Sequence, residues 1–336
     1  MSTKRMMVLG LAAGAGALLL RLLARRDSLA GKVVVITGGS RGLGLELARR
    51  CLEKNAKVAL LARDEAALKR AAEQLDGRVL TFACDVADQP AVRHAIDQVN
   101  RRYGEVDVLM HVARQMVVGP LKTMELSDYE RQLNTHLYGA IHAVNAVLPQ
   151  MRERERGHLV FISSIGGKIA IPHLLPYSAS KFALTGYAEA LRAELSNNGI
   201  GVTTVFPGLM RTGSPRNADF KGQHQREYAW FALGDSLPLV SMSSRAAAKK
   251  IVDGCERRRA EVLLLPFGKE LLALRALMPE LFASVLALAN ALLPRPGDGD
   301  GVAHKGHQSE SKWTRSVLMA LTRRAEVRNN QRAPEA

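Results

Sequence analysis

Cysteine is scarce in this chain, and the few cysteines lie far apart. There are three of them, Cys51, Cys84 and Cys255. Their spacing fits neither a set of zinc ligands nor a disulfide framework, so a zinc-stabilised domain and a disulfide-rich domain are both excluded. An odd number of scattered cysteines is typical of a protein in a reducing compartment.

Acidic and aromatic residues are also few. The chain has 32 Asp and Glu against 47 Lys and Arg, which gives a formal net charge of +15. This excess favours an anionic partner, which could be a nucleic acid, an anionic membrane surface or a phosphate-rich cofactor. Aromatic residues make up 5% of the chain and no nucleic-acid recognition module is evident, so we expect no nucleic-acid partner.

An apolar run near the N-terminus favours a membrane. Residues 6–24 carry a single charge, at Arg21. A spanning helix needs about 20 apolar residues, so the run is long enough only if Arg21 reaches toward the headgroups. We expect residues 1–26 to be an uncleaved membrane anchor; a signal peptide and a soluble or interfacial segment are the alternatives. More basic residues follow the run than precede it, which places the folded domain on the cytoplasmic side.

Short apolar runs alternate with helical patterns from residue 32 onward. This order predicts βαβ units around a parallel sheet that is buried on both faces, and no internal repeat or second domain is evident. The expected strands are 33–37, 57–61, 79–83, 106–112, 158–163, 201–206 and 261–265, and the expected helices include 42–54, 64–75, 89–102, 126–150 and 177–197. We therefore expect an α/β domain over residues 31–266.

Two regions depart from this alternation. Residues 208–245 lack clear periodicity, and an insertion beyond the carboxyl end of a strand lies where α/β proteins bind ligands. After the domain come an apolar helical extension (267–293) and a linker and basic tail (294–336), whose residues 311–328 have an apolar stripe. This stripe predicts either a surface-lying amphipathic helix or a helix that docks on its own domain.

A glycine-rich turn follows the first expected strand. In the stretch TGGSRGLG, residues 37–44, the three spaced glycines are Gly38, Gly42 and Gly44. Glycines allow a tight turn and a close approach of a pyrophosphate to the backbone, and the N-terminus of the next helix adds a partial positive charge. The turn alone is weak evidence, since its spacing is not the G-x-G-x-x-G dinucleotide pattern.

Further motifs occur in an order that strengthens this interpretation. Asp85 and Val86 follow the third strand, Tyr177 and Lys181 form a Tyr-x-x-x-Lys motif, and Ser164 lies thirteen residues before the tyrosine. Pro207 and Gly208 are followed by Thr212. Together with the turn, these residues resemble the motifs of the short-chain dehydrogenase/reductase family across residues 31–265.

The resemblance implies a Rossmann-like, doubly wound sheet of about seven strands and nicotinamide-dependent chemistry between a carbonyl and an alcohol. It implies catalytic roles for Ser164, Tyr177 and Lys181. The cofactor-binding residues that it implies are Thr37, Gly38, Ser40, Arg41, Gly42, Leu43, Gly44, Arg63, Asp85, Val86, Ala113, Tyr177, Lys181, Pro207, Gly208 and Thr212. A homodimer through helices 126–150 and 177–197 is the default assembly of the family.

The choice of cofactor is argued from two arginines. NAD-binding folds carry an acidic residue at the end of the second strand for the ribose 2′-hydroxyl. Here the strand ends Leu60-Leu61-Ala62-Arg63, with Asp64 one residue further. Arg63 and Arg41 could hold a 2′-phosphate, because guanidinium groups match phosphate geometry. We therefore expect NADP(H).

The expected chemistry centres on Tyr177. Its spacing of four from Lys181 places both side chains on one helix face. The nearby ammonium is expected to lower the phenol pKa from about 10 and favour the phenolate. Tyr177 would then exchange a proton with the substrate oxygen, Ser164 would orient that oxygen, and Lys181 would also hold the nicotinamide ribose.

Two segments depart from the family pattern. His111-Val112-Ala113-Arg114 stands where the family has Asn-Asn-Ala-Gly, which removes an asparagine that ties strands together and adds bulk near the cofactor. His136 stands where the family has an asparagine that holds a relay water. His136 could carry protons in that relay, or be a packed core histidine, and Asn134 is an alternative for the missing asparagine.

The sequence thus predicts a membrane-anchored, NADP(H)-dependent oxidoreductase. Apolar residues of the insertion, among them Met210, Tyr228 and Phe231, with the segment 173–175, favour a lipophilic ketone or alcohol as substrate. The main alternative, based on the 111–114 segment, is a catalytically weak nucleotide-binding scaffold at a membrane. No metal site is expected.

Overall fold

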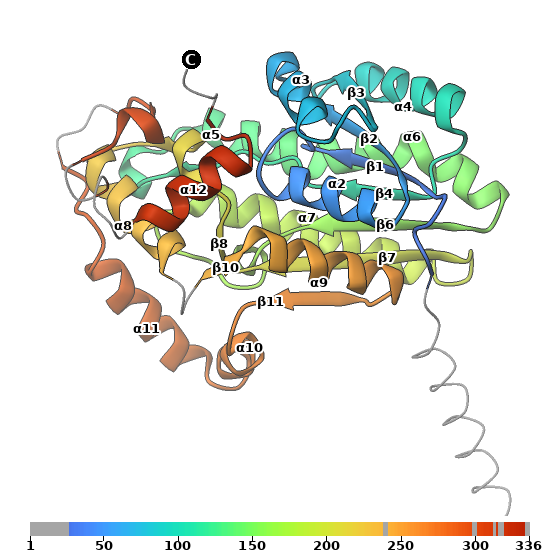
Figure 1. The fold of residues 1–336 in the computed structure, drawn as a ribbon. Coiled ribbons are helices and arrows are strands. Elements are labelled where there is room, and N and C mark those ends of the chain that lie inside the picture. Colours follow the sequence, from blue (N-terminus) through green and yellow to red (C-terminus); the bar gives the residue numbers. More distant parts are fainter. Residues whose placement is uncertain (1–26, 238–240, 298–300, 312–313, 315–318, 333–336) are drawn as a thin grey trace, which may run out of the picture.

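The computed structural model describes residues 27–237, 241–297, 301–311, 314 and 319–332, and its centre is a parallel sheet (Figure 1). Seven strands pair in the order β11-β7-β6-β4-β1-β2-β3, which confirms the predicted doubly wound sheet. They are β1 (Val33–Thr37), β2 (Lys57–Ala62), β3 (Val79–Ala83), β4 (Val108–His111), β6 (Gly157–Ile162), β7 (Ile200–Pro207) and β11 (Glu261–Leu264).

Helices cover both faces of the sheet. The helices of the domain are α2 (Gly42–Glu53), α3 (Glu65–Glu73), α4 (Gln89–Tyr103), α5 (Leu126–Leu133), α6 (Gly139–Glu153), α7 (Leu175–Glu194) and α9 (Ser244–Glu256). Val34 and Ile36 of β1 pack in one buried cluster with α2, α3 and α9. Val33 and Val35 pack in another with α4, α6 and α7. Because successive side chains alternate between faces, a run of apolar residues fills both cores at once.

The strand order places a binding crevice beside β1. β1 pairs with β2 on one side and with β4 on the other, so the chain winds in opposite directions from this strand. At such a reversal, the connections leave on opposite faces, and a crevice opens at the carboxyl ends of the strands. The glycine turn follows the carboxyl end of β1.

The helix expected over 126–150 is interrupted. α5 ends at Leu133, Asn134–Tyr138 forms a single π-helical turn, and α6 begins at Gly139. The sequence pattern did not predict this π-helical turn, because the apolar residues before and after it still follow a helical period. Such π turns are frequent near functional sites, and this one contains His136.

The insertion 208–245 folds together with the tail. A small sheet joins β9 (Asp219–Phe220) to β5 (Val117–Val118) and to β12 (His304–Lys305) of the tail. β8 (Leu209–Arg211) pairs with β10 (Ser241–Ser243), and α8 (His224–Ser236) lies between them in sequence. Phe220 makes edge-on contacts with Tyr228 and Phe231, at centroid distances of 5.3 and 6.1 Å.

Two further helical segments lie beside the sheet domain and the insertion. α10 (Gly268–Leu277) and α11 (Pro279–Ala291) form a bent pair at one edge of the molecule (Figure 1). Among the described residues, no single helix has the length and apolar character to cross a membrane, although this pair does when taken together, with a bend of 117°. α12 (Ala320–Arg328) packs on the insertion near α8. The expected anchor at 1–26 and residues 313, 317 and 318 of the expected tail stripe lie outside the described residues.

Candidate active site

A cleft opens at the carboxyl ends of β1, β2, β4, β6 and β7. Its volume is about 360 Å³, which is within the range of small-molecule and cofactor sites. Of the residues expected to act here, those that line it are Gly38, Ser40, Arg41, Gly42, Leu43, Gly44, Arg63, Asp85, Val86, Ala113, Ser164, Tyr177, Lys181, Pro207, Gly208 and Thr212. Thr37 and His136 lie behind the wall of the cleft rather than on it.

The glycine turn lines one part of the cleft with backbone that carries no side chains at Gly38, Gly42 and Gly44. Gly38 and Gly42 have φ values of +70° and +61°, a region that favours glycine because other residues are strained there. A Cβ at Gly38 would lie 2.7 Å from the Cα of Ala113. α2 begins at Gly42, so its N-terminus faces the cleft. The N–H groups of Gly38 and Gly42 are bonded to Leu61 and Asn329, but close backbone approach and the dipole of α2 at one point still fit a dinucleotide pyrophosphate.

Arginines stand at the end of the cleft beside β2 and β3. Arg41 is paired with Asp64 at 3.5 Å, and Arg63 with Asp85 at 3.7 Å. Asp64 also accepts a hydrogen bond from the backbone N–H of Ala67, which makes it the N-cap of α3. Both ion pairs are long and solvent-exposed, so they stabilise the structure by less than about 1 kcal/mol and can exchange for a stronger anion.

Ser164, Tyr177 and Lys181 meet at the other end of the cleft. Ser164 follows β6, while Tyr177 and Lys181 lie one turn apart in α7, and the Ser164 side chain is close enough to Tyr177 to act on its pKa. Lys181 Nζ donates to the carbonyl oxygen of Ile162 at 2.9 Å and lies 5.8 Å from the centroid of the Tyr177 ring. The three side chains are almost completely buried.

Burial sets the protonation of this group. It raises the pKa of Tyr177, although Arg114 and the Ser164 side chain act in the opposite direction. Burial, with a smaller effect of Arg114, lowers the pKa of Lys181 to about 7. The prediction that the pKa of Tyr177 is lowered is therefore wrong. Without ligand, desolvation outweighs the effect of the Arg114 cation and keeps the phenol protonated.

The comparisons with known proteins agree with this geometry. The sequence matches the family model for short chain dehydrogenase over residues 32–221. The chain belongs to the short-chain dehydrogenase family. Proteins of this family are oxidoreductases that use a nicotinamide cofactor, NAD or NADP.

Relatives cover most of the chain. Dehydrogenase/reductase SDR family member 7B of Danio rerio is 32% identical over 82% of this chain and 93% of that protein. The 3-ketodihydrosphingosine reductase of Bos taurus is 35% identical over 54% of this chain and 57% of that protein. A crystal structure of a short-chain dehydrogenase from Streptomyces avermitilis superposes with a TM-score of 0.66 at 27% identity, over 77% of this chain and 98% of that one.

His111 makes a side-chain contact between neighbouring strands that this short-chain dehydrogenase was expected to lack. Its Nδ1 lies 3.0 Å from the hydroxyl of Thr37, which joins β4 to β1. The same hydroxyl accepts the backbone N–H of Val112 at 3.2 Å. Burial lowers the pKa of His111 to about 3, so the imidazole is neutral. The expectation that losing the asparagine unties the strands is therefore wrong, because histidine also offers a polar ring atom at this reach.

Arg114 does not close the cleft. It lines the cleft wall, and its side chain is exposed. It is not among the described non-glycine residues with positive φ, so the backbone accepts a side chain there without strain. Instead of obstructing the site, Arg114 places a cation beside Tyr177 and Lys181, as the pKa shifts of both show.

His136 is held between two partners behind Tyr177. Its Nδ1 lies 2.7 Å from the hydroxyl of Ser180, and its Nε2 accepts the backbone N–H of Gln115. Ser180 in turn donates to the carbonyl oxygen of Tyr177. Burial holds the pKa of His136 well below its usual range, so the neutral ring supports the position of Tyr177. A proton relay through it stays a prediction, and Asn134 is exposed.

The expected substrate pocket is only partly present. Met210 lines the cleft, but Tyr228 and Phe231 are buried in the core of the insertion with Leu174. His173 is paired with Glu227 at 2.8 Å. These side chains pack the insertion together instead of lining the cleft, because Val118 of β5 and Met319 of the tail complete a small core that the sequence pattern did not show.

Sequence reasoning missed several residues of the cleft wall. Among them are Asn217, Lys305 and Gln331, which line it from the insertion and the tail. Lys305 pairs with Asp219 at 2.6 Å, which fixes the tail strand beside the insertion. No local signal points to these residues, since they come to the cleft only through pairing of segments that are distant in the chain.

Proposed function

We propose that this short-chain dehydrogenase is an NADP(H)-dependent oxidoreductase that interconverts a carbonyl and an alcohol on a lipophilic substrate at a membrane. The observation that carries the proposal is the meeting of Ser164, Tyr177 and Lys181 at one end of a cleft that begins at the glycine turn. Such a cleft holds a dinucleotide along its length and leaves its reactive end beside a proton donor.

The side chains support a reduction with simple proton balance. The bound nicotinamide supplies a hydride to the carbonyl carbon of the substrate. Tyr177, whose pKa is raised by burial, is protonated at neutral pH and gives its proton to the carbonyl oxygen as the carbonyl double bond becomes a single bond. Ser164 donates a hydrogen bond to the same oxygen and orients it. The reverse steps oxidise an alcohol.

The preference for NADP(H) is supported by charge at the β2 end of the cleft. Arg41 and Arg63 both line it there, and the carboxylate partner of each is weak and exposed. A 2′-phosphate carries more charge than one carboxylate and accepts paired guanidinium hydrogen bonds. The acidic residue nearest to the end of β2, Asp64, is engaged as the cap of α3.

A lipophilic substrate and a membrane are supported by two observations. One relative is named as a reductase of 3-ketodihydrosphingosine, a lipid ketone. α10 and α11 expose apolar side chains, with Leu277 81% and Leu288 65% exposed, more than a water-facing helix pair ordinarily shows. We further propose that residues 6–24 anchor the chain with the domain facing the cytoplasm.

The alternative hypothesis, a catalytically weak nucleotide-binding scaffold, is not supported by the geometry of residues 111–114. It depended on His111 and Arg114 as defects of the site. His111 ties β4 to β1 through Thr37, and Arg114 leaves the cleft open. We therefore favour the enzyme.

Replacement of Tyr177 by Phe tests the proposal. The full-length protein should oxidise NADPH faster than NADH with a long-chain ketone. Tyr177→Phe should lower the rate by about 10²–10⁴-fold, the usual contribution of a positioned proton donor, with little change in melting temperature or in NADPH affinity. Turnover of a panel of lipid ketones at an undiminished rate by this variant would contradict the proposed role of the phenol.

A further inference from the structure

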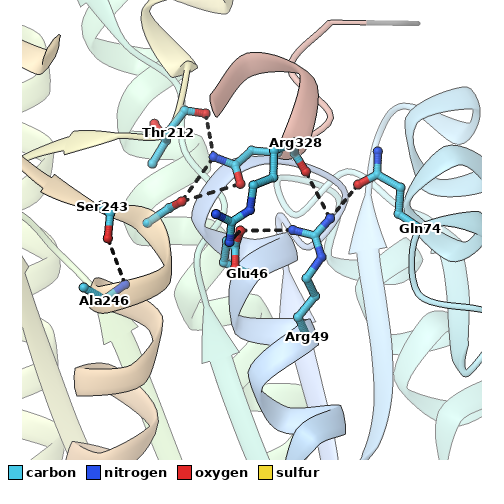
Figure 2. A network of polar contacts seen from close by, with 9 residues as sticks. Glu46, Arg49, Gln74, Thr212, Ser243, Ala246 and Arg328 are labelled. Carbon is cyan, nitrogen blue, oxygen red and sulfur yellow. Dashed lines mark hydrogen bonds and ion pairs between the residues drawn. The ribbon is translucent and has the colours of Figure 1, made fainter. Parts of the chain in front are cut away.

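A segment near the C-terminus lies on the glycine turn. Residues 328–331, which we call the C-terminal strap, are the last residue of α12 and the three that follow it, and they pass over the start of α2. Figure 2 shows Arg328 beside Glu46 and Arg49 of α2, with Thr212 on the opposite side of the network. The strap was no part of the expected site, because nearly three hundred residues separate it from the turn.

Asn329 and Asn330 are the buried centre of the strap, with 0% and 1% of their surfaces exposed. The carbonyl oxygen of Asn329 accepts the backbone N–H of Gly42 at 2.8 Å, and its side-chain amide donates to the carbonyl oxygen of Thr212 at 3.2 Å. One residue thus joins the turn to the loop that follows β8.

Asn330 fixes the outer side of the turn. Its amide nitrogen donates to the carbonyl oxygens of Ser40 and Ala67, both at 2.8 Å, and its amide oxygen accepts from Arg70 Nε at 3.0 Å. Its φ of +54° ends α12 in the left-handed conformation that asparagine and glycine tolerate. The side chain therefore has all of its polar atoms engaged with the turn and α3.

Ion pairs hold the strap to α2. Arg328 pairs with Glu46 at 2.6 Å, and its carbonyl oxygen accepts from Arg49 at 3.0 Å. Glu46 is 3% exposed and also pairs with Arg49 at 3.0 Å. A buried carboxylate between two guanidinium groups is costly to disrupt, because removal of one partner leaves a charge without compensation.

Gln331 reaches the cleft itself. It lines the cleft wall, and its amide oxygen accepts from Asn217 at 2.7 Å. Its Nε2 lies 2.8 Å from where a Cβ would stand on Gly42. The strap occupies the N–H of Gly42, one of the helix N-terminal donors that would otherwise face a phosphate. At the same place it offers a side-chain N–H₂ donor instead.

We propose that the C-terminal strap is part of the cofactor site: Asn329 and Asn330 fix the glycine turn, and Gln331 donates its amide to the cofactor pyrophosphate. The inference rests on the proposed use of a nicotinamide dinucleotide and adds a cofactor contact from the far end of the chain. Gln331 is the contact residue, whereas Asn329 and Asn330 are positioning residues.

An isosteric charge change tests the contact. Gln331→Glu keeps the oxygen that accepts from Asn217 and replaces the donor by an anion. In the full-length protein, the dissociation constant of NADPH, measured by titration without substrate, should rise at least tenfold at low salt. The rise should shrink in 0.5 M NaCl, because salt screens the repulsion between the carboxylate and the pyrophosphate. The matched change Gln98→Glu, on α4, should alter the constant less than twofold.

Two further variants test the positioning role. Asn330→Gly keeps the helix end, since glycine suits a positive φ, but removes the bonds to Ser40, Ala67 and Arg70. It should raise the dissociation constant about fivefold or more and speed amide hydrogen exchange at Gly42 in the cofactor-free protein. A chain that ends at Val327 should show both effects more strongly, whereas a chain that ends at Arg332 should behave as the full-length protein.

The outcomes separate this inference from the proposed function. If the full-length protein binds neither NADPH nor NADH, the proposed function fails and the inference fails with it. If it binds NADPH but Gln331→Glu and the chain ending at Val327 bind equally well, the strap inference alone is overturned. Tighter binding by the shortened chain also overturns it, since the strap would then obstruct the site. If the shortened chain does not fold, the NADPH affinities of Gln331→Glu and Asn330→Gly test the strap inference without it.

Discussion

Lys181 shows how much a residue in the site depends on its surroundings. Its side chain is 2% exposed, and its amine donates to the carbonyl oxygen of Ile162. Burial and the Arg114 cation lower its pKa from 10.5 to about 7. At neutral pH the folded protein therefore holds this amine near half protonation, whereas the unfolded chain holds it charged.

This difference predicts a pH-dependent stability. Between pH 7 and 10.5 the unfolded state binds a proton that the folded state does not, so the free energy of unfolding rises with pH by up to about 1.4 kcal/mol per unit. The Lys181→Met variant should lose this increase. We expect urea denaturation between pH 7.5 and 9 to give a smaller slope of stability against pH for the variant than for the original protein.

The comparison has its own control. Titrating groups that do not interact with Lys181 cancel in the difference of slopes. Lys181 also lowers the pKa of the buried histidines His111 and His136, so the comparison is made between pH 7.5 and 9, where burial keeps both imidazoles neutral. Parallel curves in this range would show that the pKa of Lys181 is not lowered in the folded protein.

At the scale of elements, the junction between the insertion and the domain depends on a helix cap. α9 follows β10 directly, and the Ser243 hydroxyl accepts the backbone N–H of Ala246 at 3.2 Å (Figure 2). The first N–H groups of a helix have no partner within it, so this bond satisfies one of them. α9 is also the helix that packs against α2 in one core.

Removal of this cap should destabilise the domain measurably. Ser243→Ala is expected to lower the free energy of unfolding by about 1 kcal/mol, the usual cost of losing a serine N-cap. Ser243→Thr keeps a hydroxyl and should recover most of that loss. Urea denaturation of the three proteins gives the measurement, and an alanine variant as stable as the original would show that the cap contributes nothing.

The elements themselves were mostly readable from the sequence. All seven expected strands are present within two residues of the observed bounds, because buried parallel strands are short, apolar and separated by helices. The π turn at 134–138 and the small sheet of β5, β9 and β12 were not expected. Both depend on how elements pack, and a two-residue strand carries no period that a sequence can show.

At the scale of the whole molecule, α10 and α11 are unlike the rest of the surface. In α11 only Phe282 is buried, while Val285 and Leu288 are 48% and 65% exposed. The chain is strongly cationic. An apolar helix pair on a cationic protein suits the interface of an anionic bilayer, where burial of apolar side chains and attraction to headgroups act together.

Acidic substitutions in α11 should weaken membrane binding. In the chain that starts at residue 27, where residues 6–24 do not contribute, we expect the double variant Val285→Asp, Leu288→Asp to bind anionic vesicles at least tenfold more weakly. Each buried aliphatic side chain contributes about 1.5–3 kcal/mol. Vesicle sedimentation is the measurement, and the melting temperature should change little because both side chains are exposed.

The matched control changes exposed leucines at another place. Leu121, in the 3₁₀ turn Leu121–Thr123, and Leu126, the first residue of α5, are 69% and 73% exposed. Their replacement by Asp adds the same charge to the protein. Equal loss of vesicle binding in this control would assign the effect to net charge, and unchanged binding in the α11 variant would exclude that helix pair as the lipid contact.

The candidate site was predictable where its residues are close in the chain. The turn at 37–44 and the pair Tyr177 and Lys181 follow from local spacing, and all of them except Thr37 and Gly39 line one cleft. The protonation of Tyr177 was not predictable, since burial outweighs its neighbours only in the folded protein. The role of His111 depended on its distance from Thr37, which lies 74 residues earlier.

The sequence by itself determined the parallel sheet, the crevice beside β1 and the residue types at the glycine turn, because period, glycine placement and short-range spacing are properties of the chain. Tertiary structure alone decided that Tyr228 and Phe231 fill a core and that Gln331 reaches the cleft. The physical reason is that burial and hydrogen bonding between distant segments depend on which surfaces meet, and no local pattern encodes that meeting.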